Sequence, residues 1–257
     1  MAMKLKVIQL NTWFGKYFDG IVEFVEQEKP DVLLMQEVVR GGLGELNHGK
    51  AGFYEEIKKR LGYEGVCEPM WRVKRPVEYE LGVAIMSKNK LVESGSEFYF
   101  KHLVEYEQEP VVGKGGAWEF PGLLLWSRVE TGAGIVKLMT THFVWSLYPE
   151  VNDFQRTALR SLLEKLAGQE RFVLGGDFNV TSESEIYAGL IKSGLVDDRP
   201  IDTKRTIHPT IHRVGEKELA VDFVFHKGEG FEVVDSRVPL VDISDHLPVV
   251  VEYEVGN

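Results

Sequence analysis

The chain has 257 residues, a length that suits one compact core. Acidic residues outnumber basic ones 40 to 30, which gives a formal net charge of -10. This charge disfavours a function that requires binding of long nucleic acid to a basic face of the protein. The single cysteine, Cys67, excludes an intramolecular disulfide and favours a reducing compartment. We therefore expect a cytoplasmic protein in which Cys67 is a small buried residue.

No Pro/Ser-rich linker, low-complexity tract or internal repeat divides the chain, so we expect residues 1–257 to form one domain. Residues 1–6 lead straight into an apolar run and lack the hydrophobic region and cleavage site of a signal peptide. No apolar run is long enough to span a bilayer.

The first part of the chain alternates predicted strands and helices. Residues 7–10 and 32–35 are short aliphatic runs typical of buried strands, and polar residues, among them Asn11 and Glu37, follow them. Residues 18–27 carry a helical apolar stripe that stops before Pro30, where proline disfavours continuation. A second helix is expected over residues 54–61 and a strand over residues 81–86.

Three segments in this half carry weaker patterns. Residues 41–44 lack the full glycine spacing of a dinucleotide fingerprint, and we expect a flexible rim loop. Residues 71–75 are basic around Trp71; they line a phosphate-binding groove or, as we prefer, form a solvated loop anchored by the tryptophan. Residues 101–121 are acidic and contain glycine; they shape a substrate pocket or form a surface loop.

The second half continues with strands predicted over residues 123–129, 135–139, 171–174, 221–225 and 247–253. Helices are predicted over residues 153–166, with Phe154 in the apolar stripe, and over residues 185–191, capped by Thr181 and Ser182. Because early strands alternate with helices and later ones follow as hairpins, the sequence predicts two packed mixed sheets with helices outside, an α+β fold.

Acid and base groups lie where these later strands begin or end. In Gly175-Gly176-Asp177-Phe178-Asn179, the acid and the amide are two residues apart, and in an extended chain they face one pocket. Taken alone, this pattern is more typical of an Asx turn.

Three further polar sites accompany it. Ser244-Asp245-His246-Leu247-Pro248 places an acid and a base at a strand rim, where catalytic residues gather. His142 ends the run 135–139 after two threonines. Asp222 stands inside an apolar strand, where its desolvation is costly unless it is paired.

In order and spacing, these sites resemble the endonuclease/exonuclease/phosphatase superfamily, the deoxyribonuclease I-like fold. Its members are metal-dependent phosphoesterases that include pancreatic deoxyribonuclease, abasic-site endonucleases, neutral sphingomyelinases and inositol polyphosphate 5-phosphatases. The resemblance covers nearly the whole chain, and its most specific motifs are Gly-Asp-Phe-Asn and Ser-Asp-His-Leu-Pro. It implies a four-layer α/β/β/α sandwich.

Phosphoester cleavage needs a cation, an activated water held in line and donors for the pentacoordinate oxygens. Glu37 and Asn11 are hard oxygen ligands suited to Mg²⁺ or Mn²⁺, and Asp245 is a further direct or water-mediated ligand. Alone, Glu37 is more typical of an exposed strand end and Asn11 of a turn. The complete pattern reverses that preference.

Asp177 is the candidate that orients and deprotonates the water, with Asn179 holding the water or a phosphate oxygen. Paired with Asp222, His246 is fixed in one tautomer and either donates to a non-bridging oxygen or serves as the base.

His142 is expected to be a second donor to the phosphate. Its orienting partner is then Glu80, which precedes the strand over residues 81–86 as a matching glutamate does in the deoxyribonuclease branch. The chain departs from the family at Ala220, because an arginine often stands immediately before the Ile/Val-Asp-Tyr motif. It also departs at Gln155 and Arg156, which are adjacent rather than a turn apart.

The remaining histidines show no paired spacing of a zinc site, and we expect them at the surface. They are His48, His102, His208, His212 and His226.

The sequence thus predicts a Mg²⁺- or Mn²⁺-dependent phosphoesterase that cleaves a phosphodiester or phosphomonoester by direct attack of water. The net charge favours a small-molecule or lipid head-group substrate over nucleic acid. The alternatives are a repair-type DNA or RNA endonuclease or exonuclease, and a non-catalytic binding scaffold of the same fold. The leaving group, the natural metal and the oligomeric state stay open.

Overall fold

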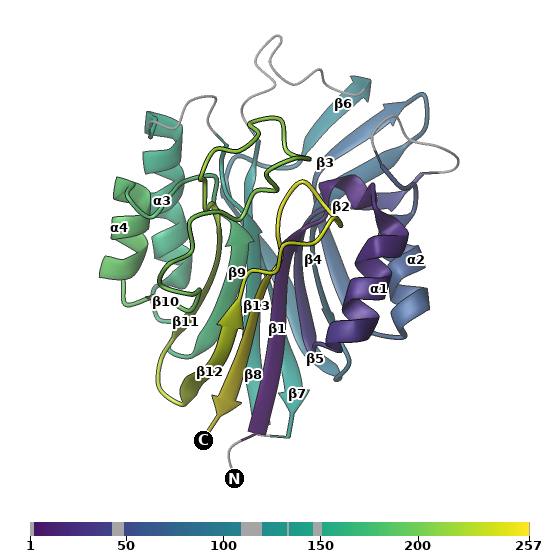
Figure 1. Ribbon diagram of the computed structural model, residues 1–257. Coiled ribbons are helices and arrows are strands. Elements are labelled where there is room, and N and C mark those ends of the chain that lie inside the picture. Colours follow the sequence, from purple (N-terminus) through teal and green to yellow (C-terminus); the bar gives the residue numbers. More distant parts are fainter. Residues whose placement is uncertain (1–2, 43–48, 109–119, 133, 146–150, 257) are drawn as a thin grey trace.

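The structure is a computed structural model that describes residues 3–42, 49–108, 120–132, 134–145 and 151–256. They form two packed mixed sheets with helices on the outer faces (Figure 1). The predicted α+β class is confirmed. Residues 43–44 of the expected rim loop, His48, and residues 109–119 of the acidic stretch lie outside the described residues. No helix in the described ranges has the length and apolar character needed to cross a membrane.

The strands and helices have the following bounds. The strands are β1 (Met3–Asn11), β2 (Val32–Gly41), β3 (Glu64–Arg75), β4 (Tyr79–Ser87), β5 (Leu91–Phe100), β6 (Val104–Gln108), β7 (Gly122–Thr131), β8 (Gly134–His142), β9 (Phe172–Asp177), β10 (Val196–Asp197), β11 (Asp222–Lys227), β12 (Phe231–Arg237) and β13 (Val249–Val255). The helices are α1 (Phe18–Glu28), α2 (Phe53–Leu61), α3 (Asp153–Leu166) and α4 (Glu185–Lys192), with a 3₁₀ turn, η1, at Trp13–Gly15.

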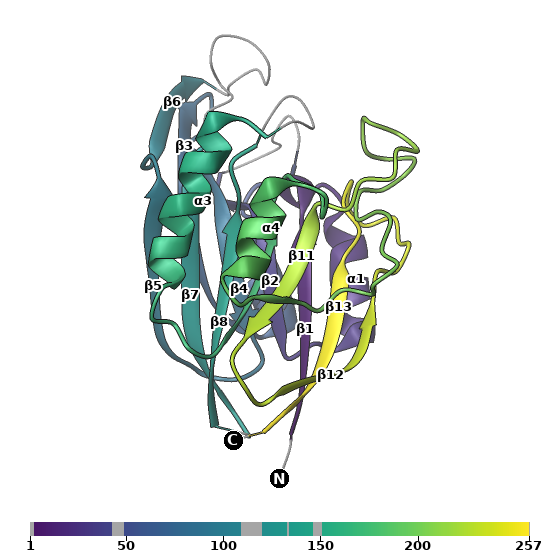
Figure 2. The same ribbon diagram turned by 90° about the vertical axis from the view of Figure 1, so that its left-hand side faces the viewer.

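One sheet has the strand order β12-β13-β1-β2-β4-β3-β6, and the other has the order β10-β11-β9-β8-β7-β5. Both are mixed, because β1–β2, β3–β6 and β8–β9 are parallel whereas the other neighbours are antiparallel. Helices α1 and α2 cover the seven-stranded sheet, and α3 and α4 cover the six-stranded sheet (Figures 1 and 2). These are the four expected layers.

The helices follow the predicted patterns with two exceptions. Phe154 is 48% exposed, because α3 turns a different stripe toward the sheet, and a capping box joins Asn152 and Gln155 at its start. Helix α4 is capped by the Ser184 side chain, which accepts from the N–H of Tyr187, rather than by the two residues expected from the sequence.

The expected solvated loop over residues 71–75 is wrong, because these residues end strand β3. Trp71 is buried and packs edge-to-face against Tyr106 and Phe120. The basic residues between the buried ones face outward, where Arg72 and Lys74 pair with acids of the neighbouring β6. A half-buried strand with alternating charges thus has the composition of a polar loop.

The core between the sheets is apolar along most of its length and polar at one end. At that end, Gln9 Nε2 donates to Gln36 Oε1 at 2.7 Å and to Asp222 Oδ1 at 2.9 Å. Gln36 Nε2 donates in turn to Thr140 Oγ1 at 2.8 Å. All four side chains are fully buried, so hydrogen bonds lock one sheet to the other at this end.

Candidate active site

Strand pairing brings three ionisable residues of the six-stranded sheet into one row. His142 on β8 is the parallel partner of Asp177 on β9, and Asp177 is the antiparallel partner of Asp222 on β11. From the opposite sheet, the Asn11 Nδ2 at the end of β1 donates to Asp177 Oδ2 at 3.1 Å. The row therefore faces the ends of β1 and β2, where the polar bridge between the sheets lies.

A bulge in β2 turns Glu37 into the same space. In a regular strand, Gln36 and Glu37 would face opposite sides. The register of β2 against β4 shifts between Met35 and Val38, and Glu37 has a left-handed φ of 53°. Both side chains consequently point toward the opposite sheet, and Glu37 Oε1 accepts from Asn11 Nδ2 at 3.1 Å.

Left-handed backbone is concentrated at this site. Six non-glycine residues among those described have a positive φ, and four of them line the pocket: Trp13, Phe14, Glu37 and Asn179. Each such residue costs about 1–3 kcal/mol, so the surrounding structure must hold it in place.

Glycines 175 and 176 allow β9 to bring Asp177 this close to its neighbours. A Cβ on Gly175 would lie 2.8 Å from Leu34 Cδ1 of the opposite sheet. A Cβ on Gly176 would lie 2.4 Å from the backbone oxygen of Thr141. The two glycines before the acid are therefore required by packing.

His246 and Asp222 form a buried acid–base pair. Asp222 Oδ2 lies 2.8 Å from His246 Nδ1, and its other oxygen accepts from Gln9. Burial alone would lower the pKa of His246, but the charges of Asp222 and Asp177 hold that pKa well above its usual value. His246 is therefore an imidazolium near neutral pH, and its Nε2 lies 3.8 Å from Asp177 Oδ2.

His142 approaches the same carboxylate from the other side, with Nε2 3.5 Å from Asp177 Oδ2. Burial lowers the pKa of His142, although the charge of Asp177 opposes this effect. Asp177 Oδ1 accepts from the Asn179 N–H at 2.9 Å, and Asn179 Nδ2 donates to the Phe143 oxygen. The Asx turn and the shared pocket, which the sequence offers as alternatives, thus occur together.

Glu37 and Asp245 concentrate negative charge in the pocket. Burial, followed by the neighbouring charge of Asp245, raises the pKa of Glu37 to about 8. Burial also raises the pKa of Asp245, and Asp177 and Asp222 add to this effect while His246 opposes it. A divalent cation relieves such crowding, and hard carboxylate oxygens are the ligands that Mg²⁺ and Mn²⁺ prefer. These two residues fit a metal site.

Asn11 is oriented differently from the expected ligand. Its amide nitrogen donates to Glu37 and Asp177, and its Oδ1 accepts from the Trp13 N–H at 3.1 Å. Asn11 therefore bridges two carboxylates in this structure. Other donor atoms lie close together nearby: those of His212, Asp245 and His246 are within 4.8 Å of one another, as are those of Asp177, Asp222 and His246.

Glu80 lies apart from the other predicted site residues. Its carboxylate accepts from Arg40 and Arg72 on the strands beside β4, and it is not among the residues that line the pocket. Leu81, the next residue along, lines the pocket instead. Successive side chains of a strand face opposite sides, so Glu80 faces away from the pocket that Leu81 lines. The prediction that Glu80 orients His142 is therefore wrong.

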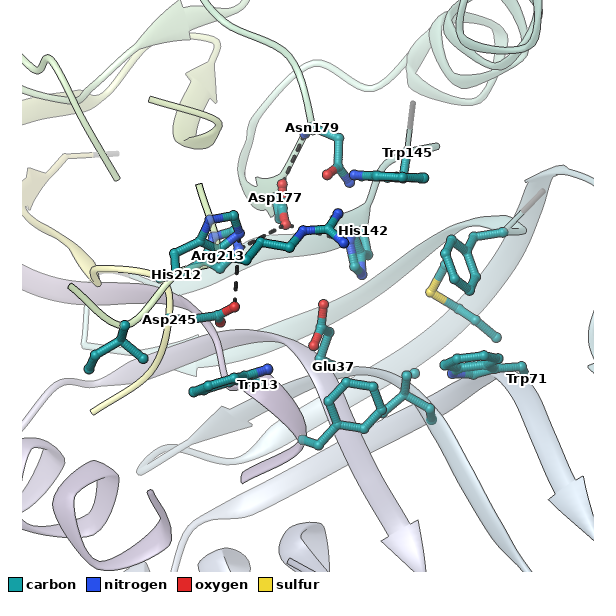
Figure 3. Close-up of a pocket in the computed structure, with 17 residues that line it drawn as sticks. Trp13, Glu37, Trp71, His142, Trp145, Asp177, Asn179, His212, Arg213 and Asp245 are labelled. Carbon is teal, nitrogen blue, oxygen red and sulfur yellow. Dashed lines mark hydrogen bonds and ion pairs between the residues drawn. The ribbon is translucent and has the colours of Figure 1, made fainter. Parts of the chain in front are cut away.

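Sequence reasoning missed two polar pocket residues, His212 and Arg213, in the segment between β10 and β11. His212, expected at the surface, packs edge-to-face on His246 with ring centres 5.6 Å apart. Burial, together with the charges of His246 and Arg213, lowers the pKa of His212 to about 4. The Arg213 guanidinium lies 5.5 Å from the Trp145 ring (Figure 3). Among the described residues, Arg213 is the only arginine or lysine that lines the pocket.

Two of the other histidines are also not simple surface residues. His208 is buried with Nε2 2.9 Å from Asp242, and the half-buried His226 lies 2.7 Å from Asp198, whereas His102 is exposed as expected. No local pattern marks His208 or His212, because both lie in irregular chain where apolar periodicity gives no direction to a side chain.

The pocket has a volume of about 320 Å³. Its acid and base groups lie on one side, and an apolar wall that includes Trp71 lies on the other, with Glu37 between them (Figure 3). The arrangement combines a buried carboxylate cluster, a cationic imidazole and one arginine, which together can bind and polarise an anionic ester.

Comparisons with known proteins agree with the fold. The profile described as the Endonuclease/Exonuclease/phosphatase family matches residues 8–246. No curated protein matches the sequence significantly. An endonuclease/exonuclease/phosphatase from Beutenbergia cavernae superposes with a TM-score of 0.77 at 21% identity, covering 99% of this chain and 72% of that one.

Two other solved structures carry more specific names. The mannosyl-6-phosphatase Bt3783 of Bacteroides thetaiotaomicron has a TM-score of 0.66 at 17% identity, covering 97% of this chain and 99% of that one. The human Nocturnin catalytic domain with a bound sulfate has a TM-score of 0.64 at 17% identity, and the match covers 99% of this chain and 96% of that one. At such identities, the likeness shows the shared fold.

Proposed function

This chain belongs to the endonuclease/exonuclease/phosphatase family, and from that premise we propose that it is a Mg²⁺- or Mn²⁺-dependent phosphoesterase acting as a single catalytic domain. The reaction is hydrolysis of a small phosphodiester or phosphomonoester by in-line attack of water. The observation that carries the proposal is the position of Asp177, whose carboxylate is approached by His142, His246 and Asn11 in one pocket.

Glu37 and Asp245 are the residues that would hold the cation. When bound, the cation supplies Lewis-acid polarisation of a phosphoryl oxygen and offsets the charge of the two carboxylates. Asn11, which links Glu37 to Asp177, fixes the position of one carboxylate relative to the other.

Two residues of the chain handle the protons of the reaction: one accepts a proton and the other donates a hydrogen bond. Asp177 orients the attacking water and accepts its proton, because its carboxylate lines the pocket between His142 and His246. His246, kept cationic by Asp222, donates to a non-bridging phosphate oxygen. Of the two roles that the sequence leaves open for His246, the raised pKa supports the donor.

Arg213 and Asn179 are positioned to contact the phosphate from the rim, since both line the pocket. Arg213 provides the fixed cation that this chain lacks at Ala220. One arginine and a net charge of -10 suit a single bound phosphate better than a phosphate backbone. A reducing, cytoplasmic location is part of the proposal, supported by the lone buried cysteine.

The test measures hydrolysis of a small diester and a duplex oligonucleotide after chelation, with Mg²⁺ or Mn²⁺ restored, across a KCl series. We expect metal-dependent turnover of the small ester, with kcat/KM that varies weakly with salt. An enzyme that neutralises about six phosphates would lose on the order of a thousandfold affinity between 50 and 200 mM salt. Faster cleavage of the duplex with that steep dependence would identify a nuclease.

The Asp177→Asn variant serves as the inactive control and should lower kcat by at least ~100-fold. Undiminished turnover in excess chelator, or in this variant, would show that the activity does not come from this site.

A further inference from the structure

The wall opposite the acid and base groups is built almost entirely from apolar side chains. Among the described residues, it comprises Trp71 of β3, the preceding Met70, Phe120, which packs on the Trp71 ring, and Leu81, the β4 partner of Trp71. None of these side chains carries a charge or a hydroxyl group. Glu37 separates this wall from Asp245 and His212, so a phosphate held by the acid and base groups would have its ester group beside the apolar wall (Figure 3).

A second bulge creates this wall. The register of β3 against β4 shifts between Pro69 and Trp71, so the consecutive residues Met70 and Trp71 are both buried and both line the pocket. Opposite the bulge, a Cβ on Gly82 would lie 1.9 Å from the backbone oxygen of Glu68. The close approach of β3 to β4 therefore requires glycine there, and Gly82 leaves that part of the pocket without a side chain.

Aromatic packing holds the wall rigid. The Trp71 ring has Phe120 at 5.1 Å and Tyr106 at 5.4 Å, each at an interplanar angle of 81°. Edge-to-face contacts of this kind favour one orientation of the indole. A surface that is already ordered binds a flat ligand at a low entropic cost.

We propose that this wall is a leaving-group subsite and that the enzyme prefers phosphate esters of a flat aromatic group; the inference rests on the proposed phosphoesterase function. A hydroxyl-rich leaving group would lose its water contacts there, and the indole N–H of Trp71 is the single side-chain donor that the described wall residues offer in return. An aromatic ring buries apolar area and adds ring–ring contacts. The volume of about 320 Å³ lies at the small end of ligand pockets and suits one or two rings beside a phosphate better than an extended acyl chain.

The test uses phosphonates, which cannot be hydrolysed, so that binding is read independently of turnover. Calorimetry in Mg²⁺ compares benzylphosphonate with cyclohexylmethylphosphonate, methylphosphonate and a hexose 6-phosphonate. We expect benzylphosphonate to bind at least ~10-fold more tightly than the methyl and hexose compounds, with the cyclohexyl compound between them.

The Phe120→Ala variant removes a half-buried ring of the wall and should reduce the benzyl-to-methyl affinity ratio to below ~3-fold. The matched control is Phe100→Ala, which removes a half-buried ring that packs on Phe154 and does not line the pocket; it should keep the wild-type ratio. Thermal unfolding of both variants verifies that they are folded. An unchanged ratio in Phe120→Ala would contradict the subsite.

The possible outcomes separate this inference from the proposed function. Equal affinity for the hexose and benzyl compounds, with metal-dependent hydrolysis intact, overturns the aromatic subsite alone. Equal affinity for the cyclohexyl and benzyl compounds overturns the preference for a flat group. Selective binding of benzylphosphonate by a protein that hydrolyses no ester with either metal overturns the phosphoesterase and leaves the aromatic site.

Discussion

Replacement of Asp222 by asparagine tests how the buried pair prepares His246. The carboxylate accepts two hydrogen bonds, from Gln9 Nε2 at 2.9 Å and from His246 Nδ1 at 2.8 Å. An amide has only one acceptor atom, so its NH₂ group must face a donor on one side. Hydrogen bonds to charged groups contribute about 1.5–3 kcal/mol each, and the variant therefore loses at least that much interaction energy.

If that loss is felt in the transition state, kcat falls by about 10- to 150-fold in Asp222→Asn while KM changes little. The pKa of His246 should also fall, because the charge of Asp222 is a principal cause of its elevation. An imidazolium with a lower pKa loses its proton at lower pH. The deficit of the variant should therefore grow as the pH rises, which a pH series of kcat together with a histidine NMR titration would measure.

Asp198→Asn is the matched control. Asp198 is also buried and accepts from Tyr253 and pairs with His226 at 2.7 Å, but it does not line the pocket. We expect a comparable loss of stability in urea unfolding, with kcat within about 2-fold of the wild-type value. Equal kcat values for the two variants, or an unchanged His246 titration in Asp222→Asn, would refute the positioning role of Asp222.

Three further outcomes follow from the geometry. Glu37→Gln should raise the Mg²⁺ concentration for half-maximal activity at least ~10-fold, whereas Glu80→Gln should leave it unchanged; equal metal titrations would remove Glu37 from the metal site. Gly176→Ala should lower the free energy of unfolding by about 1–3 kcal/mol, because the added Cβ meets a backbone oxygen. Gly20→Ala is the control: Gly20 lies inside α1, and the atom nearest to its added Cβ, on Ile243, is 3.4 Å away, so this variant should be neutral or stabilising in thermal unfolding. Burial raises the pKa of Cys67 to about 12, so iodoacetamide at pH 8 should label this thiol only as fast as the protein unfolds. Rapid labelling of the native protein would instead show that Cys67 is accessible as a thiolate.

Strands in the middle of the sheets could be predicted because aliphatic runs identify them directly, as for β1, β2, β8 and β9. The edge strands β6 and β12 could not, because short, largely exposed strands that contain several charged residues share the composition of loops. For the site, polar residues beside apolar runs mark Asp177 and His246 as candidates along the chain. That the two lie in one site could be inferred only from the resemblance to the family.

The errors in the site have two physical sources. Glu80 and Leu81 differ by one position, and strand alternation turns such a difference into opposite faces of the sheet. His212 and Arg213 reach the pocket through irregular chain, where the direction of a side chain depends on long-range packing that no local pattern encodes.

The row formed by His142, Asp177 and Asp222 across three strands makes the site sensitive to chain length rather than to composition alone. A single-residue deletion within β9 would either move Asp177 out of the row or, if Asp177 stays in place, reverse the face of the residues that precede the deletion in the strand. Insertions between β10 and β11 would leave the row intact, since that connection does not set the pairing of β9. Over evolutionary time, and in designed libraries, length variation should therefore accumulate in the connections at the pocket rim, while the row of His142, Asp177 and Asp222 persists.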